Sequence, residues 1–481
     1  MQRIFVIQAL ENKGKKVKVS GWVHVRRDHG KIIFIDLRDR SGLLQVVFAP
    51  SKIEDGAVVY ENAKKLRSEW VVSIEGTVNE RPANSQNTEL PTGSIELFAE
   101  KLEILSESQT PPFDISDERV MNEVSEELTM KYKYLDLRRV KRTRNLTLRH
   151  RITKIVRDFL DNEGFLEIET PILTKSTPEG ARDYLVPSRL QRGTFYALPQ
   201  SPQQYKQLLM VGGIEKYFQI ARCFRDEDTR GDRQPEFTQL DLEMSFVERE
   251  DIMALNEKLL IEIIQKLFPE KKIQETPFPR LSYKEAMEKY ETDRPDLRKD
   301  KSDPNLLAFC WIVDFPFFER TDTHSTSSGQ AGGWTFTHNP FSAPKSEFMD
   351  DLLAQKNITE ILTTQYDIVL NGLEIGGGSI RNHKPEALEA VFKIMGFDEQ
   401  RITENFGHML EAFKFGTPPH GGIAWGFDRL VMILANEPNI REVIAFPKTG
   451  DGRDLMMNAP SGVSTEQLLE LGISIKKNDT K

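Results

Sequence analysis

The sequence predicts an α+β protein that begins with a small β-barrel and continues as a larger domain in which helices flank an antiparallel sheet. Two observations predict it. Five short apolar segments, with one helical stretch after the third, fill about the first hundred residues. Beyond residue 140, strand-like segments follow one another without regular intervening helices, which favours an antiparallel sheet over a doubly wound one. At roughly 100–200 residues per domain, 481 residues leave room for both parts.

The first part, residues 1–104, is expected to be a closed barrel of the OB type. Strands are expected over 17–22, 32–35, 43–48, 70–78 and 95–104, and a helix over 60–69. This layout is typical of the OB fold, a common platform for nucleic acids, although another small β-barrel would give a similar pattern. Residues 1–50 carry ten Lys and Arg against four Asp and Glu, as expected of a module that meets nucleic acid.

A linker is expected over residues 105–140 and a second domain over 141–481. Apolar residues recur at helical spacing between residues 152 and 160, and Gly164 supplies a helix stop. Residues 321–333, rich in Ser, Thr and Gly, are expected to form a mobile loop. Further helices are expected over 250–268 and 347–362, and strands over 165–170, 217–225, 236–246, 308–314, 366–371, 373–381 and 422–426.

The composition excludes several classes of protein. With 38% hydrophobic and 29% charged residues, the chain is neither fibrous nor disordered. It has no run of about 18 apolar residues that could span a membrane, and its first residues do not read as a secretory signal. Cys223 and Cys310 are too isolated for a disulfide framework or a cysteine zinc site. We therefore expect a cytoplasmic protein with two reduced thiols.

Three segments of the second part carry candidate chemistry. Residues 164–171 (GFLEIETP) combine a helix stop, a strand and a proline. Residues 224–227 (FRDE) precede a charged loop and a strand, and residues 422–429 (GIAWGFDR) form a glycine-spaced strand that runs into a helix. In this order the three segments resemble motifs 1, 2 and 3 of the class II aminoacyl-tRNA synthetases.

Longer segments are similar to one family of that class, the bacterial aspartyl-tRNA synthetases, and the resemblance covers nearly the whole chain. The segments that carry it are QSPQQYKQ (200–207), CFRDEDTRGDRQPEFTQLDLE (223–243), GGGSIR (376–381) and PPHGGIAWGFDR (418–429), with GWVHVRRDHGKIIFIDLRDRSGLLQVVF (21–48) similar to the anticodon-binding OB domain. One departure is large. PDLR (295–298) lies only a dozen residues before WIVDFP (311–316), so the family's inserted domain is missing near 299–309.

The resemblance implies a ligase with two steps. Aspartate and ATP would form aspartyl-adenylate, and the 3'-terminal adenosine of tRNA would then take the aspartyl group. It also implies Mg²⁺ and a homodimer that pairs through the segment from helix 150–163 to Pro171. Two alternatives remain at this point: a paralogue that acts without tRNA, and a nucleic-acid-binding protein with an inactive catalytic domain.

The resemblance also assigns the residues for ATP. Arginine matches phosphate with a planar, permanently charged fork, so Arg225 would bind the α-phosphate and Arg429 the far end of the triphosphate, as the catalytic pair. Asp367 and Glu374 would bind Mg²⁺, which prefers carboxylate oxygens. The full set of implied ATP contacts is Arg225, Asp226, Glu227, Gln234, Glu374, Gly426, Phe427, Asp428 and Arg429.

A buried carboxylate needs cations around it, and Lys206 and Arg381 match the family's pair for the side chain of aspartate. Its ammonium group would meet Glu179, Gln203 and Asp241. The loop over 175–183 resembles a lid, with Gly180 permitting the movement. The implied aspartate contacts are Glu179, Gln203, Lys206, Arg225, Asp241, His338 and Arg381, where His338 stands in a THNP segment.

In the barrel, Phe34 would stack on an unpaired base and Gln45 would read a base edge, although Phe34 lies in the apolar run IIFI and could be a core residue instead. His29 stands where strict members of the family carry leucine and relaxed members carry histidine. We therefore expect a non-discriminating enzyme that charges tRNA(Asp) and tRNA(Asn), with strict specificity for tRNA(Asp) as the alternative. The expected anticodon contacts are Arg26, His29, Phe34, Gln45 and Asn84.

Overall fold

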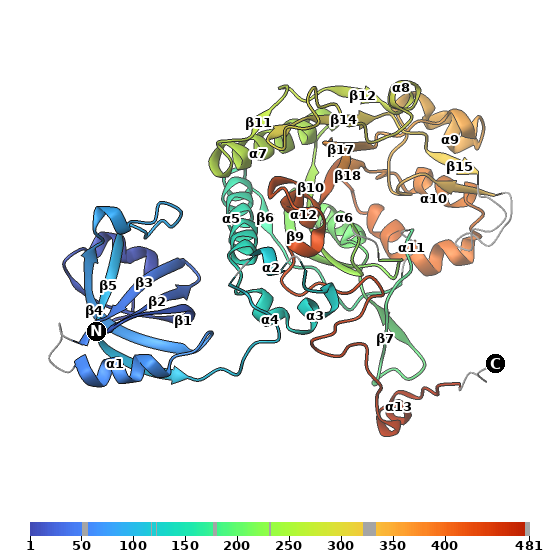
Figure 1. Cartoon of the computed structure of the whole chain (residues 1–481). Coiled ribbons are helices and arrows are strands. Elements are labelled where there is room, and N and C mark those ends of the chain that lie inside the picture. Colours follow the sequence, from blue (N-terminus) through green and yellow to red (C-terminus); the bar gives the residue numbers. More distant parts are fainter. Residues whose placement is uncertain are drawn as a thin grey trace. The chain divides into compact units, whose positions relative to one another are not determined.

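The structure is a computed structural model that describes residues 1–50, 56–116, 118–121, 123–176, 180–229, 232–320 and 333–476. These residues form two compact units, Met1–Arg144 and Asn145–Lys481 (Figure 1). The expected mobile loop over 321–333 lies outside the described residues except for Gly333. None of the described helices has both the length and the apolar run needed to cross a membrane.

The first unit contains the predicted barrel. Its strands pair in the closed order β1-β2-β3-β5-β4, and α1 stands between β3 and β4, which is the OB arrangement. The helix begins and ends earlier than expected. The elements are β1 (Lys16–His29), β2 (Ile32–Asp39), β3 (Gly42–Phe48), α1 (Gly56–Lys65), β4 (Val71–Glu80) and β5 (Ile95–Ser106).

The alternation of β2 settles the position of Phe34. Ile33, Ile35 and Leu37 are buried in the barrel core, so the residues between them face outward. Phe34 is half-buried on this outer face, and its ring meets the ring of His29 edge to face at 5.8 Å. Phe34 is therefore not a core residue.

The segment between barrel and sheet is ordered rather than a bare linker. It contains α2 (Glu118–Met121), α3 (Glu126–Lys131) and α4 (Lys133–Asp136). Asp136 is fully buried and accepts bonds from Lys133 at 2.6 Å and from Arg139 at 2.9 Å. These cations, together with Arg142 at 2.8 Å, hold the pKa of Asp136 below its ordinary value against the opposing effect of burial.

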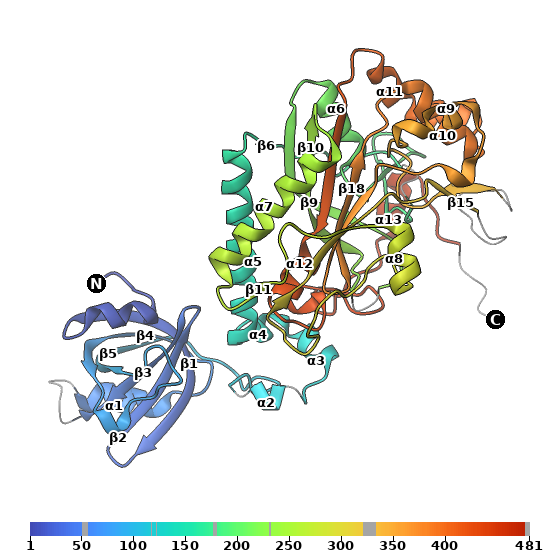
Figure 2. The ribbon, with the colours of Figure 1, turned by 90° about the horizontal axis from the view of Figure 1, so that it is seen from above.

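The second unit is built on an eight-stranded sheet of order β12-β14-β17-β18-β19-β10-β9-β6. Its strands β9, β10 and β18 are labelled in Figure 2. All its neighbours pair antiparallel except the outermost pairs, β12 with β14 and β6 with β9. The antiparallel sheet with flanking helices is thus confirmed. Its strands are β6 (Leu166–Glu167), β9 (Lys216–Phe224), β10 (Glu236–Ser245), β12 (Arg280–Ser282), β14 (Phe309–Val313), β17 (Tyr366–Leu370), β18 (Leu373–Ile380) and β19 (His420–Gly426).

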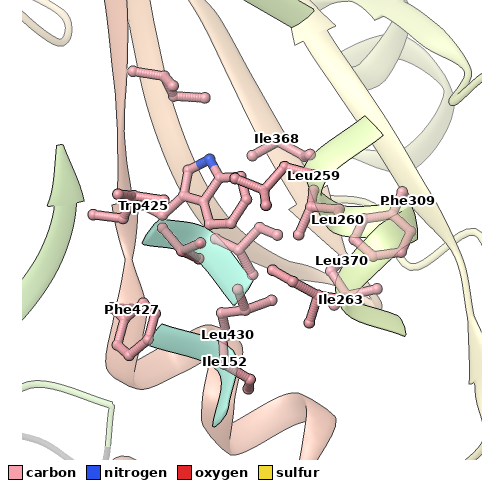
Figure 3. Close-up of a cluster of buried hydrophobic side chains, with 14 of the residues drawn as sticks. Ile152, Leu259, Leu260, Ile263, Phe309, Ile368, Leu370, Trp425, Phe427 and Leu430 are labelled. Atoms are coloured by element: carbon pink, nitrogen blue, oxygen red, sulfur yellow. The ribbon is translucent and has the colours of Figure 1, made fainter. Parts of the chain in front are cut away.

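Helices α5, α7 and α12 cover one face of this sheet. Ile152 of α5, Leu259 of α7 and Leu430 of α12 meet Ile368 of β17 and Trp425 of β19 in one buried cluster (Figure 3). The helices of the unit are α5 (Val140–Asn162), α6 (Gln203–Val211), α7 (Arg249–Leu267), α8 (Tyr283–Tyr290), α9 (Met349–Ala354), α10 (Pro385–Ile394), α11 (Glu399–Phe413), α12 (Phe427–Leu434) and α13 (Thr465–Leu471). Short paired strands complete it: β7 (Leu185–Pro187), β8 (Phe195–Ala197), β11 (Lys272–Ile273), β13 (Leu306–Leu307), β15 (Phe318–Arg320) and β16 (Trp334–Phe336).

Two expected elements are shorter than the sequence indicated. The strand expected over 165–170 ends at Glu167, because only β9 pairs with it and Thr170 instead donates to the side chain of Gln219. The helix expected over 347–362 shrinks to α9, since Gln355 and Asn357 adopt left-handed backbone conformations with φ of 52° and 48°. Helices α6, α8, α10, α11 and α13 were not predicted from the sequence.

Candidate active site

The face of the sheet opposite the hydrophobic core borders a cavity of about 430 Å³. The alternation of side chains along β10 explains why this face of the sheet is polar. Leu240 and Leu242 point into the core, so Asp241 and Glu243 point to the other face. Strand β17 alternates likewise, with Ile368 in the core and Asp367 at the cavity. One face of each strand therefore supplies stability and the other supplies polar chemistry.

Most of the residues expected for ATP and aspartate line this cavity, although they come from many separate elements. Asp226 does not line it, and the ring of Phe427 is buried in the hydrophobic core with the Arg149 guanidinium over it at 5.1 Å. Glu179 lies outside the described residues. The expected residues that line the cavity are Gln203, Lys206, Arg225, Glu227, Gln234, Asp241, His338, Asp367, Glu374, Arg381, Gly426, Asp428 and Arg429.

Four buried charges form one ion cluster at the cavity. The Lys206 ammonium lies 2.5 Å from Asp241 Oδ1 and 3.3 Å from Glu243 Oε2. Arg381 donates Nε and Nη2 to the two oxygens of Glu243 at 2.8 and 3.1 Å. No member is more than 2% exposed. Two cations are thus balanced by two carboxylates, and Glu243 holds both cations in place.

Sequence reasoning missed Glu243, although a signal was present. It follows Asp241 by two residues on an expected strand, and the period of two places both carboxylates on one face. Burial favours a raised pKa for Glu243, but Arg381 and Lys206 hold that pKa below its ordinary value. Burial dominates at Asp241, whose pKa is raised despite Lys206.

Two glycines make room for acidic side chains on neighbouring strands. A Cβ atom at Gly422 would collide with the carboxylate of Glu243 and with the carbonyl of Leu242. A Cβ atom at Gly377 on β18 would collide with the carboxylate of Asp367. Glycine is required at Gly422, where the backbone carbonyl of Leu242 blocks a side chain, and at Gly377 it leaves room for the Asp367 carboxylate in its present position.

Two arginines line the cavity with part of their donor capacity unused. The Arg225 guanidinium lies 5.1 Å from the ring centre of Phe237, and its Nε is buried without a hydrogen-bond partner among the described residues. Arg429 donates Nη1 to the carbonyl of Glu374 at 2.5 Å, while its buried Nε has no partner in the same described set. Both side chains are therefore equipped to bind an anion in the cavity.

Two of the expected ATP residues already have structural partners. The Gln234 side chain accepts from the backbone N–H of Lys448 at 2.7 Å and donates to its carbonyl at 3.2 Å. Asp428 accepts from Arg149 at 2.5 Å and from the backbone N–H of Thr238 at 2.8 Å. These bonds orient the start of α12 and the loop before β10, so they also position Arg429 and Arg225.

Asp367 and Glu374 bring two carboxylates to neighbouring strands. Asp367 is buried and accepts from Gln365 Nε2 at 2.7 Å, while the His338 ring nitrogen lies 3.8 Å from it. Burial, with repulsion from Glu374, raises the pKa of Asp367 well above its ordinary range. Burial likewise lowers the pKa of His338.

This donor set fits a magnesium ion. Within the described residues, no group of three or more His, Cys, Asp and Glu side chains is placed to hold a metal. Two carboxylates are nevertheless the usual protein share of a Mg²⁺ site whose other ligands are phosphate oxygens and water. A divalent cation would also offset the repulsion that raises the pKa of Asp367.

A second set of residues that sequence reasoning missed joins the two ends of the cavity. Arg381 Nη1 donates to Ser379 Oγ at 2.9 Å, and the hydroxyls of Ser379 and Ser342 lie 2.9 Å apart. Ser342 donates to Gln365 Oε1 at 3.3 Å, and Gln365 in turn donates to Asp367. A continuous hydrogen-bonded chain therefore connects a cation of the ion cluster to the carboxylate pair.

On the barrel, the expected anticodon residues share the outer face or lie in exposed loops. Gln45 is buried there and donates to Glu96 at 2.8 Å, while Arg81 donates to its oxygen. Asn84 is exposed in a short turn. Arg26 donates to Asp28 and to the carbonyls of residues 64 and 66, so the structure gives it a local structural role.

Two protein families match parts of this chain. The family described as tRNA synthetases class II (D, K and N) matches residues 125–450, more than half of the sequence. The family described as OB-fold nucleic acid binding domain matches residues 17–105. The two matches fall on the sheet-containing unit with its preceding segment and on the barrel.

Curated relatives are similar over nearly the full length. The aspartate–tRNA(Asp/Asn) ligase of Rubrobacter xylanophilus is 42% identical, covering 96% of this chain and 95% of that protein. The enzyme of the same name from Thermoanaerobacter pseudethanolicus is also 42% identical, with 97% of each chain covered.

Solved structures share the fold. The chain is similar to asparaginyl-tRNA synthetase from Pyrococcus horikoshii, complexed with asparaginyl-adenylate, with a TM-score of 0.71, 24% identity and coverage of 91% of this chain and 96% of that one. A putative aspartyl-tRNA synthetase from Leishmania major Friedlin gives a TM-score of 0.72 at 22% identity, with 93% of each chain covered. At these identities the likeness concerns the fold alone.

Proposed function

The chain belongs to the class II tRNA synthetases of the D, K and N group, and we propose that its reaction is the aspartylation of both tRNA(Asp) and tRNA(Asn). The sequence-based prediction of an aminoacyl-tRNA ligase is confirmed by this membership and by the near full-length relatives named aspartate–tRNA(Asp/Asn) ligases. The anticodon-type barrel at the N-terminus argues against a paralogue that acts without tRNA.

One structural observation carries the choice of aspartate. The cavity is lined by two fully buried cations, Lys206 and Arg381, held by a shared carboxylate. A substrate carboxylate between them would gain charge-assisted hydrogen bonds, whereas a neutral amide would bring no opposing charge. Asp241 accepts from Lys206 through Oδ1, and its other oxygen, together with Gln203, would accept from the substrate ammonium.

The other expected side chains of the cavity would bind ATP and its metal ion during adenylation. The α-carboxylate of aspartate attacks the α-phosphate of ATP and pyrophosphate leaves, so negative charge builds on the phosphate oxygens. Arg225 would donate to the α-phosphate and Arg429 to the terminal phosphates. Mg²⁺ bound by Asp367 and Glu374 would neutralise phosphate charge. A terminal hydroxyl of the tRNA then takes the aspartyl group and AMP leaves, with positioning as the main source of catalysis.

Recognition of two tRNAs is proposed for the tip of the β1–β2 hairpin. The exposed His29 ring lies beside Phe34, so a base stacked on Phe34 would meet the imidazole edge. The two anticodons, GUC for tRNA(Asp) and GUU for tRNA(Asn), differ only at the third base. An imidazole can donate or accept a hydrogen bond, and it therefore suits either pyrimidine there.

We expect the unmodified protein to aspartylate purified tRNA(Asp) and tRNA(Asn), and His29→Leu to lower kcat/KM for tRNA(Asn) about tenfold more than for tRNA(Asp). Loss of a hydrogen bond to one base accounts for a change of this size. Initial aspartylation rates with each tRNA measure it, with His408→Leu, at an exposed histidine of α11, as the control. Charging of tRNA(Asp) alone by the unmodified protein contradicts the proposal. Equal losses of kcat/KM with both tRNAs would show that His29 does not determine the acceptance of tRNA(Asn).

A homodimer is proposed through the edge of the sheet at β6. This strand ends the strand order, and exposed apolar side chains gather on and just after it: Leu166, Ile172 and Leu173. An unpaired edge beside exposed apolar side chains is an unstable surface for a monomer. Pairing across a two-fold axis would cover it on both copies.

Sedimentation of the unmodified protein at micromolar concentration is expected to give a species of about twice 55.2 kDa. Leu173→Glu should shift it to the monomer, because a charge would be buried in the interface. Leu353→Glu, at an exposed apolar position of α9, should leave the dimer intact. A fully active 55.2 kDa species of the unmodified protein would refute the proposed dimer.

The missing inserted domain is a further part of the proposal. The alignment with the Rubrobacter relative spans 587 positions, whereas 96% of 481 residues is about 462, so about 125 positions have no residue in this chain. We place this gap near residues 299–309. The domain limits of 1–104, 105–140 and 141–481, and a cytoplasmic location where tRNA, ATP and aspartate meet, complete the proposal.

A further inference from the structure

Two buried side chains, Gln207 and His420, form a hydrogen-bonded row with Gln203, and the expected chemistry assigns neither of them a role. Gln203 Nε2 donates to Gln207 Oε1 at 2.9 Å, one turn along α6. Gln207 Nε2 lies 3.2 Å from Nε2 of His420, the first residue of β19. His420 Nδ1 lies 2.9 Å from the carbonyl oxygen of Pro418. His420 and Gln207 have no exposed surface, and Gln203 is 3% exposed.

The chemistry of the last group fixes the direction of the whole row. The carbonyl of Pro418 can only accept, so Nδ1 of His420 carries the proton and donates. In the neutral ring Nε2 is then an acceptor. Gln207 must therefore turn its NH₂ group toward the histidine and its carbonyl oxygen toward Gln203. Each amide orientation follows from the one before it.

The row ends at the cavity. Gln203 lines the cavity, and its NH₂ group is engaged by Gln207, so its carbonyl oxygen is the atom left to accept. A reversed Gln203 would instead present an NH₂ group, which repels an ammonium. We propose that His420 is a positioning residue that, through Gln207, holds the Gln203 amide with its oxygen toward the ammonium of the amino-acid substrate. This inference rests on the proposed function.

The surroundings of His420 keep the ring in the required form. Burial is the main cause that lowers its pKa to about 4, with Arg381 and His383 acting in the same direction and Glu243 in the opposite one. The Phe413 ring lies 6.3 Å away. The ring is therefore neutral at pH 7, with one donor and one acceptor.

The test compares three variants in aspartate-dependent ATP–pyrophosphate exchange. His420→Leu removes the acceptor, and we expect the KM for aspartate to rise about tenfold while the KM for ATP stays within about twofold. His420→Gln can place an oxygen near the position of Nε2, and it should recover most of the aspartate affinity. His408→Leu, an exposed histidine of α11, is the matched control and should leave both constants unchanged.

A double variant separates positioning from general damage to the pocket. Because His420 acts only through Gln203, adding His420→Leu to Gln203→Leu should raise the KM for aspartate by less than about twofold further. If His420→Leu does not fold, Gln207→Met breaks the same row at its centre and should give the same tenfold rise. Retained affinity in that variant overturns the inference.

The outcomes distinguish this inference from the proposed function. An unchanged KM for aspartate in His420→Leu, additive effects in the double variant, or an equal rise in the KM for ATP would overturn the positioning role alone. No aspartate-dependent exchange by the unmodified enzyme would overturn the proposed function and this inference with it.

Discussion

Lys206→Leu is expected to lower kcat/KM for aspartate in ATP–pyrophosphate exchange by more than about a hundredfold, with the KM for ATP changed less than about threefold. The substitution removes one cation facing the proposed substrate carboxylate and leaves Asp241 and Glu243 with a single cation between them. Truncating one partner of a buried, hydrogen-bonded charge pair in a binding site costs about 2–5 kcal/mol of binding free energy, and each 1.4 kcal/mol is a factor of ten. Steady-state exchange with each substrate varied in turn measures both constants.

The control is Lys266→Leu, which removes an exposed lysine paired with Glu262 on α7 and should leave the exchange unchanged. Thermal unfolding should show Lys206→Leu to be the less stable of the two variants, because its uncompensated charges are buried. An aspartate kcat/KM within tenfold of the unmodified enzyme, or equal exchange by the unmodified enzyme with asparagine, would refute the role given to the ion cluster.

Arg225→Lys is expected to lower kcat for exchange by about a hundredfold while leaving stability nearly unchanged. Lysine keeps the charge but loses the planar fork, and a single lost donor at a developing charge typically costs about 10²–10³ in rate. The Arg225 guanidinium lies over the Phe237 ring, and it forms no ion pair within the described ranges, so its replacement breaks no charge network there. Rapid-quench measurement of aspartyl-adenylate formation in a single turnover separates the adenylation step from product release.

Arg222→Lys is the matched control for that experiment. Arg222 precedes Arg225 by three residues at the end of β9, but it pairs with Glu236 and donates to Thr238 rather than lining the cavity. It should retain nearly full activity. If both variants lose activity equally, the loss comes from disruption of β9 and not from the missing guanidinium of Arg225.

The strand pattern made much of the fold predictable. Regular alternation on β2 and β10 predicts which side chains enter a core, and here it separates Ile33 from Phe34 and Leu242 from Asp241. Short elements were less predictable, because left-handed residues such as Gln355 end a helix that the sequence pattern continues. The apolar spacing alone carries no sign of that backbone conformation.

The sequence predicted most of the residues that line the cavity but not how they are bonded to one another. Lys206 and Arg381 could be placed by motif, whereas the partnership of Gln207 with His420 joins positions 213 apart in the sequence. Only the folded sheet brings α6 against the start of β19. For the same reason, the structural bonds of Gln234 and Asp428 were not visible in the sequence.

The shared position of Glu243 constrains the order in which mutations can change amino-acid selectivity. With the role proposed for Lys206, a change from an acidic toward an amide substrate would make this lysine dispensable, yet losing it first would leave an uncompensated negative charge in the interior. Glu243→Gln first would leave two cations with one carboxylate. Neither single step is neutral, but the pair preserves the charge balance. We therefore expect the effects of substitutions at positions 206 and 243 to be non-additive, so that a change of selectivity requires both substitutions rather than one.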